Sequence, residues 1–250
     1  MSIHRNSFIE SFAQNSPALN TIFLNHVGAP SKLLTDVPTI ELLADKNAIN
    51  NFILFCTAHP LVKHIKVSSF YRFKNILVEF VDGSELHFCL LTNMIRKSFL
   101  CLNVNDIRKT ATVNTFGMLA PELKYHIEYM ALKTQFNKDP LSDRYKNYFA
   151  GFDFKERAVV FKYLQTRYNL IFNTIEDLYK PKPNIFLTIL IGLRSEKENT
   201  LFKMFIRSIE ITLYRLLSYV SKREKHIIPS LSQAPDFPGR NKNSARQAML

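Results

Sequence analysis

The stretch from Ile76 to Leu91, ILVEFVDGSELHFCLL, decides the fold class. Apolar residues alternate with other residues on both sides of Asp82-Gly83, which is the period-two pattern of strands with one buried face. Asp-Gly between two such runs is typical of the primed two-residue turn that joins antiparallel strands. The sequence therefore predicts a β-hairpin over residues 75–91, with Gly83 at positive φ.

Upstream of this hairpin, helical and extended patterns alternate. Asp45 follows a short apolar run and is well placed to cap a helix, because its carboxylate can accept a hydrogen bond from a first-turn amide. Nearer the start, Ser16-Pro17 predicts a helix break, since proline lacks the amide hydrogen that an interior helical residue donates. The expected elements are a broken helix over 6–26, a buried strand over 39–44, a helix over 46–57 and an extended segment over 62–73.

Downstream of the hairpin, the pattern becomes helical from about Ser98. Helices are expected over residues 121–136, 154–168 and 201–221, and the sequence Lys180-Pro-Lys-Pro183 marks a break between them. We therefore expect an α+β fold, in which a small mixed sheet packs on helices and is followed by a mainly helical region. Its expected parts are an α/β core over 1–97, a helical region over 98–225 and a flexible basic tail over 226–250.

The charge of the chain is strongly basic and unevenly placed. The formal net charge is +12, and residues 101–250 hold 24 Lys and Arg against 14 Asp and Glu. A field of this sign favours nucleotides, nucleic acid, anionic lipid or an acidic protein partner, although no recognised nucleic-acid module accompanies it. A generally basic, solvated surface is the alternative interpretation.

The cysteines and the apolar runs indicate in which cellular compartment the protein is expected. Cys56, Cys89 and Cys101 are odd in number and lack metal-ligand spacing, so neither a disulfide framework nor a zinc site is indicated. The first residues lack the continuous apolar run of a secretory signal, and the run from Ile185 to Leu193 is shorter than the ~20 residues that span a bilayer. A cytoplasmic protein without a transmembrane segment is expected.

Three stretches of the sequence, together with this order of elements, resemble a known family. FVDGSELHFCLL, VNTFGMLAPELKYHIEYM and DRYKNYF together resemble nucleotidyltransferase-like proteins of bacterial surface-polysaccharide gene clusters, over roughly residues 20–170. Members of that superfamily hold a nucleoside triphosphate through two or three carboxylates that coordinate magnesium. The resemblance thus implies a magnesium-dependent transferase, acting in surface-polysaccharide or nucleotide-sugar metabolism.

This chain departs from the acidic pattern of that superfamily. The resemblance places the acidic pair at Thr39 and Glu41 and the third carboxylate at Cys89, so only Glu41 keeps the charge. The preceding turn would be the irregular Gly28-Ala-Pro-Ser31. One carboxylate cannot hold a magnesium pair, and neither a hydroxyl nor a thiol replaces the missing negative charge.

Several side chains therefore carry two interpretations. Glu41 is either a metal ligand or a strand residue at the sheet edge facing water, and Cys89 is either at the acidic site or a small buried apolar residue. If a further carboxylate completes the site, Asp36 or Asp45 is the nearest in sequence. The expected phosphate-binding cations flank a cleft beside the hairpin, and they are Arg96, Lys97, Arg108 and Lys109.

The helix expected over 201–222 is amphipathic. Its apolar stripe consists of Leu201, Phe205, Ile209, Leu213, Leu216 and Val220. Docking of this stripe on the protein's own core is the default for such a helix, and binding to an anionic surface or a protein partner is the alternative.

Two functional hypotheses follow. The first is a nucleotidyltransferase-like protein that binds a nucleoside triphosphate and, with magnesium at Glu41, transfers the nucleotide. The second is a non-catalytic binding or scaffold module of the same ancestry that recognises a nucleotide, an anionic surface or a protein partner. The missing carboxylates favour the second hypothesis on mechanism.

Overall fold

The computed structural model describes residues 3–25, 39–102, 104–169, 175–220 and 226–229. Its centre is a mixed six-stranded sheet in the order β1-β2-β5-β4-β3-β10, in which β2 and β5 are parallel and every other pair is antiparallel. The α+β fold class is confirmed. The strands are β1 Ile22–Phe23, β2 Ile40–Leu43, β3 Val62–Phe70, β4 Phe73–Phe80, β5 Glu85–Leu91 and β10 His226–Pro229.

The hairpin of β4 and β5 forms as expected, but its turn differs from the primed two-residue turn. Gly83 has a φ of +79° and is the residue of this connection with positive φ. The amide of Phe80 donates to the carbonyl of Ser84 at 2.9 Å, so three residues connect the strands. A three-residue connection ends in a left-handed residue, and this is the position that Gly83 takes.

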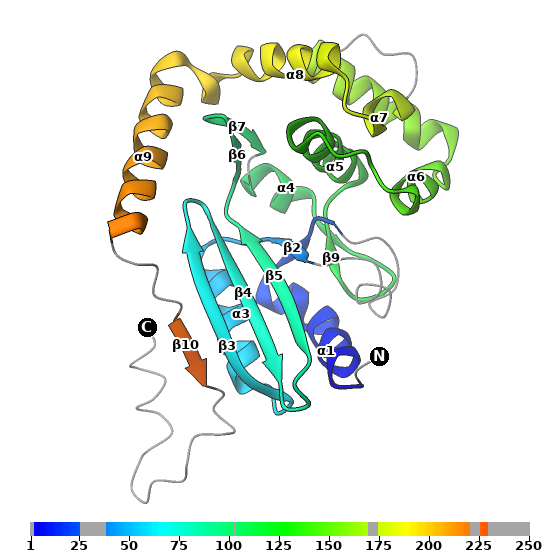
Figure 1. Cartoon of the computed structure of the whole chain (residues 1–250). Coiled ribbons are helices and arrows are strands. Elements are labelled where there is room, and N and C mark those ends of the chain that lie inside the picture. The colour runs from blue at the N-terminus through cyan, green and yellow to red at the C-terminus, as the bar shows by residue number, and fades with distance from the viewer. Residues whose placement is uncertain (1–2, 26–38, 103, 170–174, 221–225, 230–250) are drawn as a thin grey trace, which may run out of the picture.

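One face of the sheet is covered by two helices, α1 (Ile3–Leu19) and α3 (Lys46–Ala58), which lie behind it in Figure 1. Asp45 caps α3 as expected, because its carboxylate accepts from the amide of Ala48 at 2.8 Å. The buried side chains of this layer are largely aromatic, with ring centroids of neighbouring phenylalanines 4.9 to 6.4 Å apart. They include Phe8, Phe12, Phe52 and Phe88.

The helix break expected at Ser16-Pro17 is absent, because α1 continues through Pro17 to Leu19. Proline cannot donate to the carbonyl of Ala13, but the hydroxyl of Ser16 donates to that carbonyl at 2.9 Å. The same hydroxyl accepts from the amide of Leu119 at 2.9 Å. This side chain therefore compensates for the missing backbone bond one residue before the proline.

The helical region lies beyond one end of the sheet, in the upper part of Figure 1. Its helices α5 and α7 lie close to the expected ranges, whereas α8 was not anticipated. The helices are α4 Val104–Thr110, α5 Leu123–Asn137, α6 Asp143–Ala150, α7 Phe154–Tyr168, α8 Pro183–Ser195 and α9 Leu201–Val220. The Lys180–Pro183 break falls directly before α8, with Pro183 in the first turn.

Two short hairpins correct the expectation that helix begins at about Ser98. The first joins β6 (Met94–Arg96) to β7 (Phe99–Leu102), and the second joins β8 (Thr112–Val113) to β9 (Leu119–Ala120). The expected boundary between residues 97 and 98 falls inside the turn of the first hairpin.

The expected tail also needs correction. Residues His226–Pro229 form β10 and pair with β3, so the first four residues of the segment 226–250 belong to the sheet. An added edge strand needs only the exposed backbone N–H and C=O groups of β3. Its own sequence therefore shows no specific pattern from which the pairing could be predicted. Residues 230–250 lie outside the described part of the chain.

The helical region packs on a second apolar core that also includes residues of β1, β2 and β5, and its helices bury a carboxylate. Glu128 on α5 is fully buried and lies 2.7 Å from the guanidinium of Arg167 on α7. The hydroxyls of Tyr163 and Tyr168 donate to the same carboxylate. Burial raises the pKa of Glu128, and Arg167 opposes that rise. This network joins α5 to α7, and we assign it a structural role.

The helix α9 turns its apolar stripe away from the molecule. The side chains of Leu201, Phe205, Ile209, Leu213 and Leu216 are between 42% and 66% exposed, so the expected docking of the stripe on the protein's own core is wrong. Residues of the opposite side of the helix, among them Arg207 and Tyr214, contact the body instead. No helix in the described ranges combines the length and the apolar character needed to cross a membrane.

Candidate anion-binding pocket

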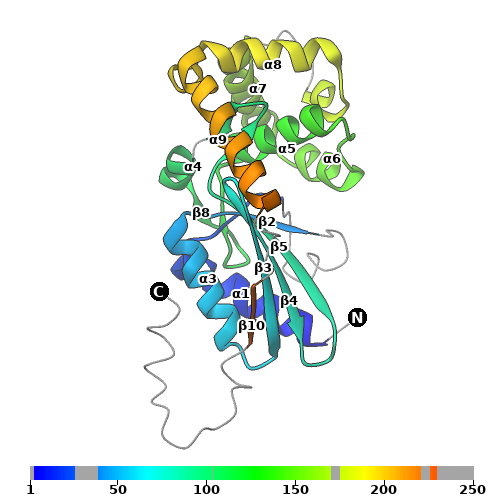
Figure 2. The same cartoon turned by 60° about the vertical axis from the view of Figure 1, so that its left-hand side comes forward.

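A cavity of about 380 Å³ lies where the sheet, the β6–β7 hairpin and α9 meet. Its floor is formed by residues of β2, β5 and α5, and its rim by the turn between β3 and β4, by β6 with its turn, and by α9. Figures 1 and 2 both place the lower end of α9 beside the end of the sheet where β3 and β4 meet. Elements from the whole length of the chain therefore build this pocket.

Glu41 lies on the floor of the pocket and is held by two protein groups. The ammonium of Lys133 lies 2.8 Å from each of its carboxylate oxygens, and the hydroxyl of Tyr129 donates to one of them at 2.9 Å. The Glu41 side chain is only 16% exposed. Glu41 is thus not a strand residue facing water, and its charge is already balanced by Lys133.

The other two positions of the expected acidic motif supply no anion. Cys89 pairs with Glu41 across the parallel strands, and burial together with the Glu41 carboxylate raises the pKa of its thiol to about 12. Thr39 uses its backbone carbonyl to accept from the side-chain amide of Asn25 at 2.8 Å. Near neutral pH, Cys89 is therefore a neutral, largely buried thiol.

The carboxylates that could complete a metal site are also elsewhere or engaged. Asp45 caps α3 and pairs with Arg108. Asp36 and the Gly28–Ser31 turn lie outside the described residues. Within the described ranges, no group of three or more His, Cys, Asp or Glu side chains is placed to hold a metal ion. The donor set described at this pocket therefore does not fit the magnesium pair that the resemblance implies.

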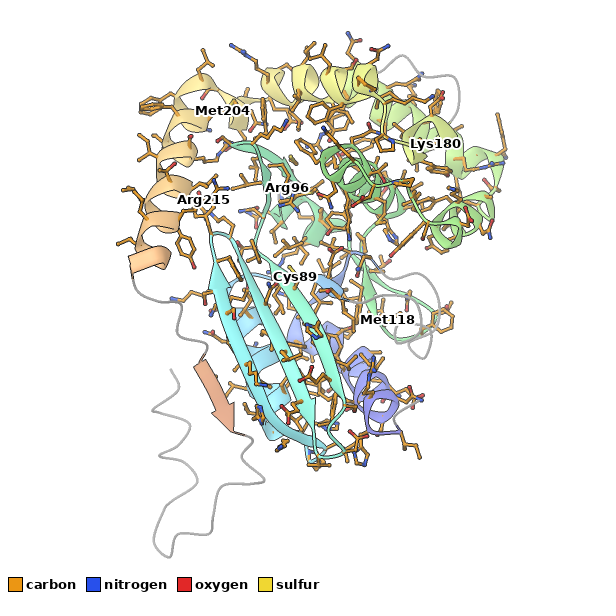
Figure 3. All side chains as sticks on the ribbon, viewed as in Figure 1. Cys89, Arg96, Met118, Lys180, Met204 and Arg215 are labelled. Atoms are coloured by element: carbon orange, nitrogen blue, oxygen red, sulfur yellow. The ribbon has the colours of Figure 1, made fainter. Side chains whose placement is uncertain are left out.

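Cationic side chains line the rim of the same pocket. Arg72 comes from the β3–β4 turn, Arg96 and Lys97 from the β6–β7 hairpin, and Arg215 from α9. Figure 3 shows Arg96, Arg215 and Cys89 on three different elements around this region. Of the described residues that line the cavity, only Glu41 carries a carboxylate. With Glu41 paired to Lys133, the pocket keeps an excess of positive charge.

The four expected phosphate-binding residues separate into two places. Arg96 and Lys97 are exposed and line the pocket. Arg108 lies on α4, where it pairs with the carboxylate of Asp45 and donates to the carbonyl of Asn20 at 3.3 Å. Lys109 is exposed on α4 and does not line the pocket.

Residues with strained backbone conformations are concentrated at the rim of the pocket. Arg72, Lys97 and Ser98 have φ values of +65°, +48° and +66°. The other described non-glycine residues with positive φ directly follow helices, where a left-handed residue is ordinary; they are Asn20, Lys138 and Asn169. Tight hairpin turns favour Gly, Asn or Asp at left-handed positions, so long cationic side chains at positions 72 and 97 cost stability.

Two tyrosine rings, tilted by 56° against each other, lie beside these cations. The rings of Tyr71 and Tyr214 have centroids 6.3 Å apart and both line the pocket. The hydroxyl of Tyr71 donates to Glu210, whose carboxylate also lies 3.9 Å from Arg72. Burial and this bond to Glu210 raise the pKa of Tyr71, which keeps the hydroxyl protonated. An aromatic face next to several cations suits a ligand with a planar ring and an anionic group.

The strained β6–β7 turn is tied to α9 through Arg207. Arg207 is 9% exposed, and its guanidinium donates to the carbonyl of Ser98 at 2.7 Å and to the side-chain oxygen of Asn199 at 2.9 Å. It also donates to the carbonyl of Glu198. Because Arg207 bonds directly to the turn, α9 and the rim residues at 96–98 are positioned together.

Two residues that line the pocket, Arg72 and Arg215, and the partner of Glu41, Lys133, were not anticipated from the sequence. Lys133 lies four residues after Tyr129 on α5, a spacing that puts both on one helix face toward Glu41. No local sequence signal marks Arg72 or Arg215 as a residue of the pocket. Comparison of the chain with protein-family models, with curated proteins and with solved structures finds no match. The resemblance to nucleotidyltransferases therefore stays a prediction.

Proposed function

We propose that this protein is a binding module for a phosphorylated ligand with a planar ring, of which nucleotides are the main class. Nucleoside triphosphates and nucleotide sugars share the required chemistry, an aromatic base joined to a chain of phosphates. The observation that carries the proposal is the set of cations, Arg72, Arg96, Lys97 and Arg215, on one cavity whose carboxylate is already paired. Guanidinium and ammonium groups bind phosphate through charge-assisted hydrogen bonds.

The described residues support binding more than nucleotidyl transfer. That reaction, as the resemblance implies it, depends on carboxylates that carry magnesium at the phosphates. In this pocket Lys133 occupies both oxygens of Glu41, and Cys89 is a neutral thiol. The transferase hypothesis would need carboxylates from another part of the chain, whereas the binding hypothesis uses the pocket as it stands.

A cytoplasmic location accords with this proposal. Cys56, Cys89 and Cys101 are free thiols, and two of them are buried. Free buried thiols are usual in a reducing compartment, where nucleotides are abundant. Localisation of a tagged full chain by cell fractionation checks this part of the proposal, and recovery in a secreted fraction would contradict it.

Calorimetric titration with ATP and with inorganic tripolyphosphate tests the proposed ligand class. We expect both to bind, with ATP binding more tightly because its base can stack at the tyrosine rings, by roughly 1–3 kcal/mol. Combined replacement Arg96→Ala and Lys97→Ala should weaken both by about 100-fold, since each charged hydrogen bond contributes about 1.5–3 kcal/mol. Lys109→Ala is the matched control, because Lys109 is an exposed cation outside the pocket. Equal weakening by the control would show that only net charge matters.

A further inference from the structure

The outward side of α9 carries a continuous apolar surface. Eight large side chains on this side are between 39% and 71% exposed: Leu201, Phe202, Phe205, Ile206, Ile209, Leu213, Leu216 and Leu217. At roughly 200 Å² for a fully exposed side chain of this size, the surface amounts to ~900 Å², close to the ~800 Å² that each partner contributes to a stable protein interface. We call these eight residues the α9 stripe.

Five residues of the α9 stripe follow a coiled-coil repeat. Phe202, Ile206, Ile209, Leu213 and Leu216 are separated by four, three, four and three residues, as core positions of successive heptads are. None of the eight stripe residues is charged. A seam of this kind packs most readily against another helix with the same repeat.

The charges of α9 distinguish a helical partner from a membrane. Membrane-surface helices place Lys and Arg where they reach lipid headgroups beside the apolar face. On α9, Arg207 and Glu210 point to the body, and the ammonium of Lys203 pairs with Glu198 at 3.0 Å. Arg215 lines the anion-binding pocket. The described cations of α9 therefore pair with groups of the protein or line the pocket, an arrangement that does not suit binding to lipid headgroups.

We propose that two copies of this chain associate through the α9 stripe, forming a symmetric pair of α9 helices. In a two-fold interface the same surface is used by both copies. Ile209 lies at the midpoint of the stripe, which runs from Leu201 to Leu217. The Ile209 side chains of the two copies therefore meet close to the two-fold axis, whether the helices run parallel or antiparallel.

Sedimentation velocity of the full chain over a range of concentrations tests this proposal. The unmodified protein should form dimers, and Ile209→Glu or Ile209→Lys should each raise the dimer dissociation constant by at least ~100-fold, since each places like charges in an apolar interface. Mixing the two variants should restore dimers, because opposite charges then meet near the axis. Ser208→Glu is the matched control, as it adds the same charge at an exposed position beside the stripe and should leave association unchanged.

The folded state of each variant is checked by its circular dichroism spectrum, which should be unchanged because Ile209 is 42% exposed, although the melting temperature should fall with the loss of dimers. A protein that stays monomeric throughout the micromolar range would overturn the proposal, and so would a dimer that both variants leave intact. Failure of the mixture to recover dimers would exclude self-association through Ile209. Binding of a monomer to phosphatidylglycerol vesicles, lost in Ile209→Glu, would assign the stripe to a membrane instead.

Discussion

The two ends of the central sheet differ in how their tight turns are made. At one end, the connection from β4 to β5 uses Gly83 at φ +79°, the residue that such a backbone favours. At the other end, Arg72 in the β3–β4 turn and Lys97 in the turn of the separate β6–β7 hairpin take left-handed conformations beside the pocket. The first end follows local preference, whereas the second departs from it and carries the cations that line the pocket. Such departures concentrate where a protein binds or reacts.

The largest effect on stability is expected at the pocket end, from Glu41→Gln. This change keeps the shape but removes the partner of Lys133, so the free energy of unfolding should fall by about 2 kcal/mol. Chemical denaturation measures the loss. Glu85→Gln is the matched control on the same face of the sheet, because the Glu85 side chain is 43% exposed, and it should change stability by less than about 0.5 kcal/mol. If Glu41→Gln leaves the free energy of unfolding unchanged, the ion pair between Glu41 and Lys133 contributes nothing to stability.

A smaller loss is expected at the opposite end, from Gly83→Val. A β-branched residue resists positive φ, so we expect a loss of about 1 kcal/mol in the free energy of unfolding. An added Cβ meets nothing within 4 Å, so the loss comes from the backbone and not from a clash. Gly83→Asn should lose less, because asparagine tolerates this conformation. Equal melting temperatures for the valine variant and the unmodified protein would refute the turn.

The reverse change at the pocket end should stabilise the protein. Lys97→Gly relieves a left-handed residue and should raise the free energy of unfolding by about 0.5 kcal/mol, while ligand affinity falls by about 10-fold. Lys97→Ala removes the same cation without relieving the backbone, and it should lose the same affinity with no gain in stability. If glycine brings no more stability than alanine, position 97 stores no strain.

Near neutral pH the smallest effect concerns the thiols, because their contribution to stability changes only as the pH rises. Burial raises the pKa of Cys89 and of Cys101 to about 12 from the ordinary value near 9. Between these values the folded state holds more protons than the unfolded state, so the stability that the two thiols contribute should stay constant below pH 9 and fall as the pH rises from 9 toward 12. Thermal melting against pH measures this, and Cys89→Ser should flatten the fall. Increasing stability in that range would contradict the assignment.

Local chemistry explains what could be predicted of the fold. Asp82-Gly83, Asp45 and the helical periodicity of 154–168 act over a few residues, and the structure confirms the hairpin, the cap and the helix at those places. The β6–β7 hairpin was not predicted, because its turn, Lys97-Ser98, contains neither Gly nor Asn, the residues typical of such turns. Likewise, Pro17 predicts a helix break, but the helix continues because the hydroxyl of Ser16 supplies the hydrogen bond that the proline cannot donate.

The candidate site was less predictable, because its contacts are distant in sequence. Arg96 and Lys97 were anticipated at a cleft, and they do line the pocket. Glu41 meets Lys133 across 92 residues, and the turn at Tyr71 meets α9 across 139 residues. No local pattern encodes such pairs. The resemblance predicts Glu41 at the site, and the position of Lys133 in the fold shows that this carboxylate has a partner.

The most direct test of the account is the magnesium dependence of nucleotide binding by the unmodified protein. In the proposed function, cations of the pocket hold the phosphates while the Glu41 carboxylate pairs with Lys133. Calorimetric titration with ATP, once with magnesium and once with excess EDTA, should therefore give dissociation constants that agree within about threefold, or favour the free nucleotide because it carries more charge. Tight binding that requires magnesium and is lost in Glu41→Gln would contradict the account and restore the metal-dependent enzyme.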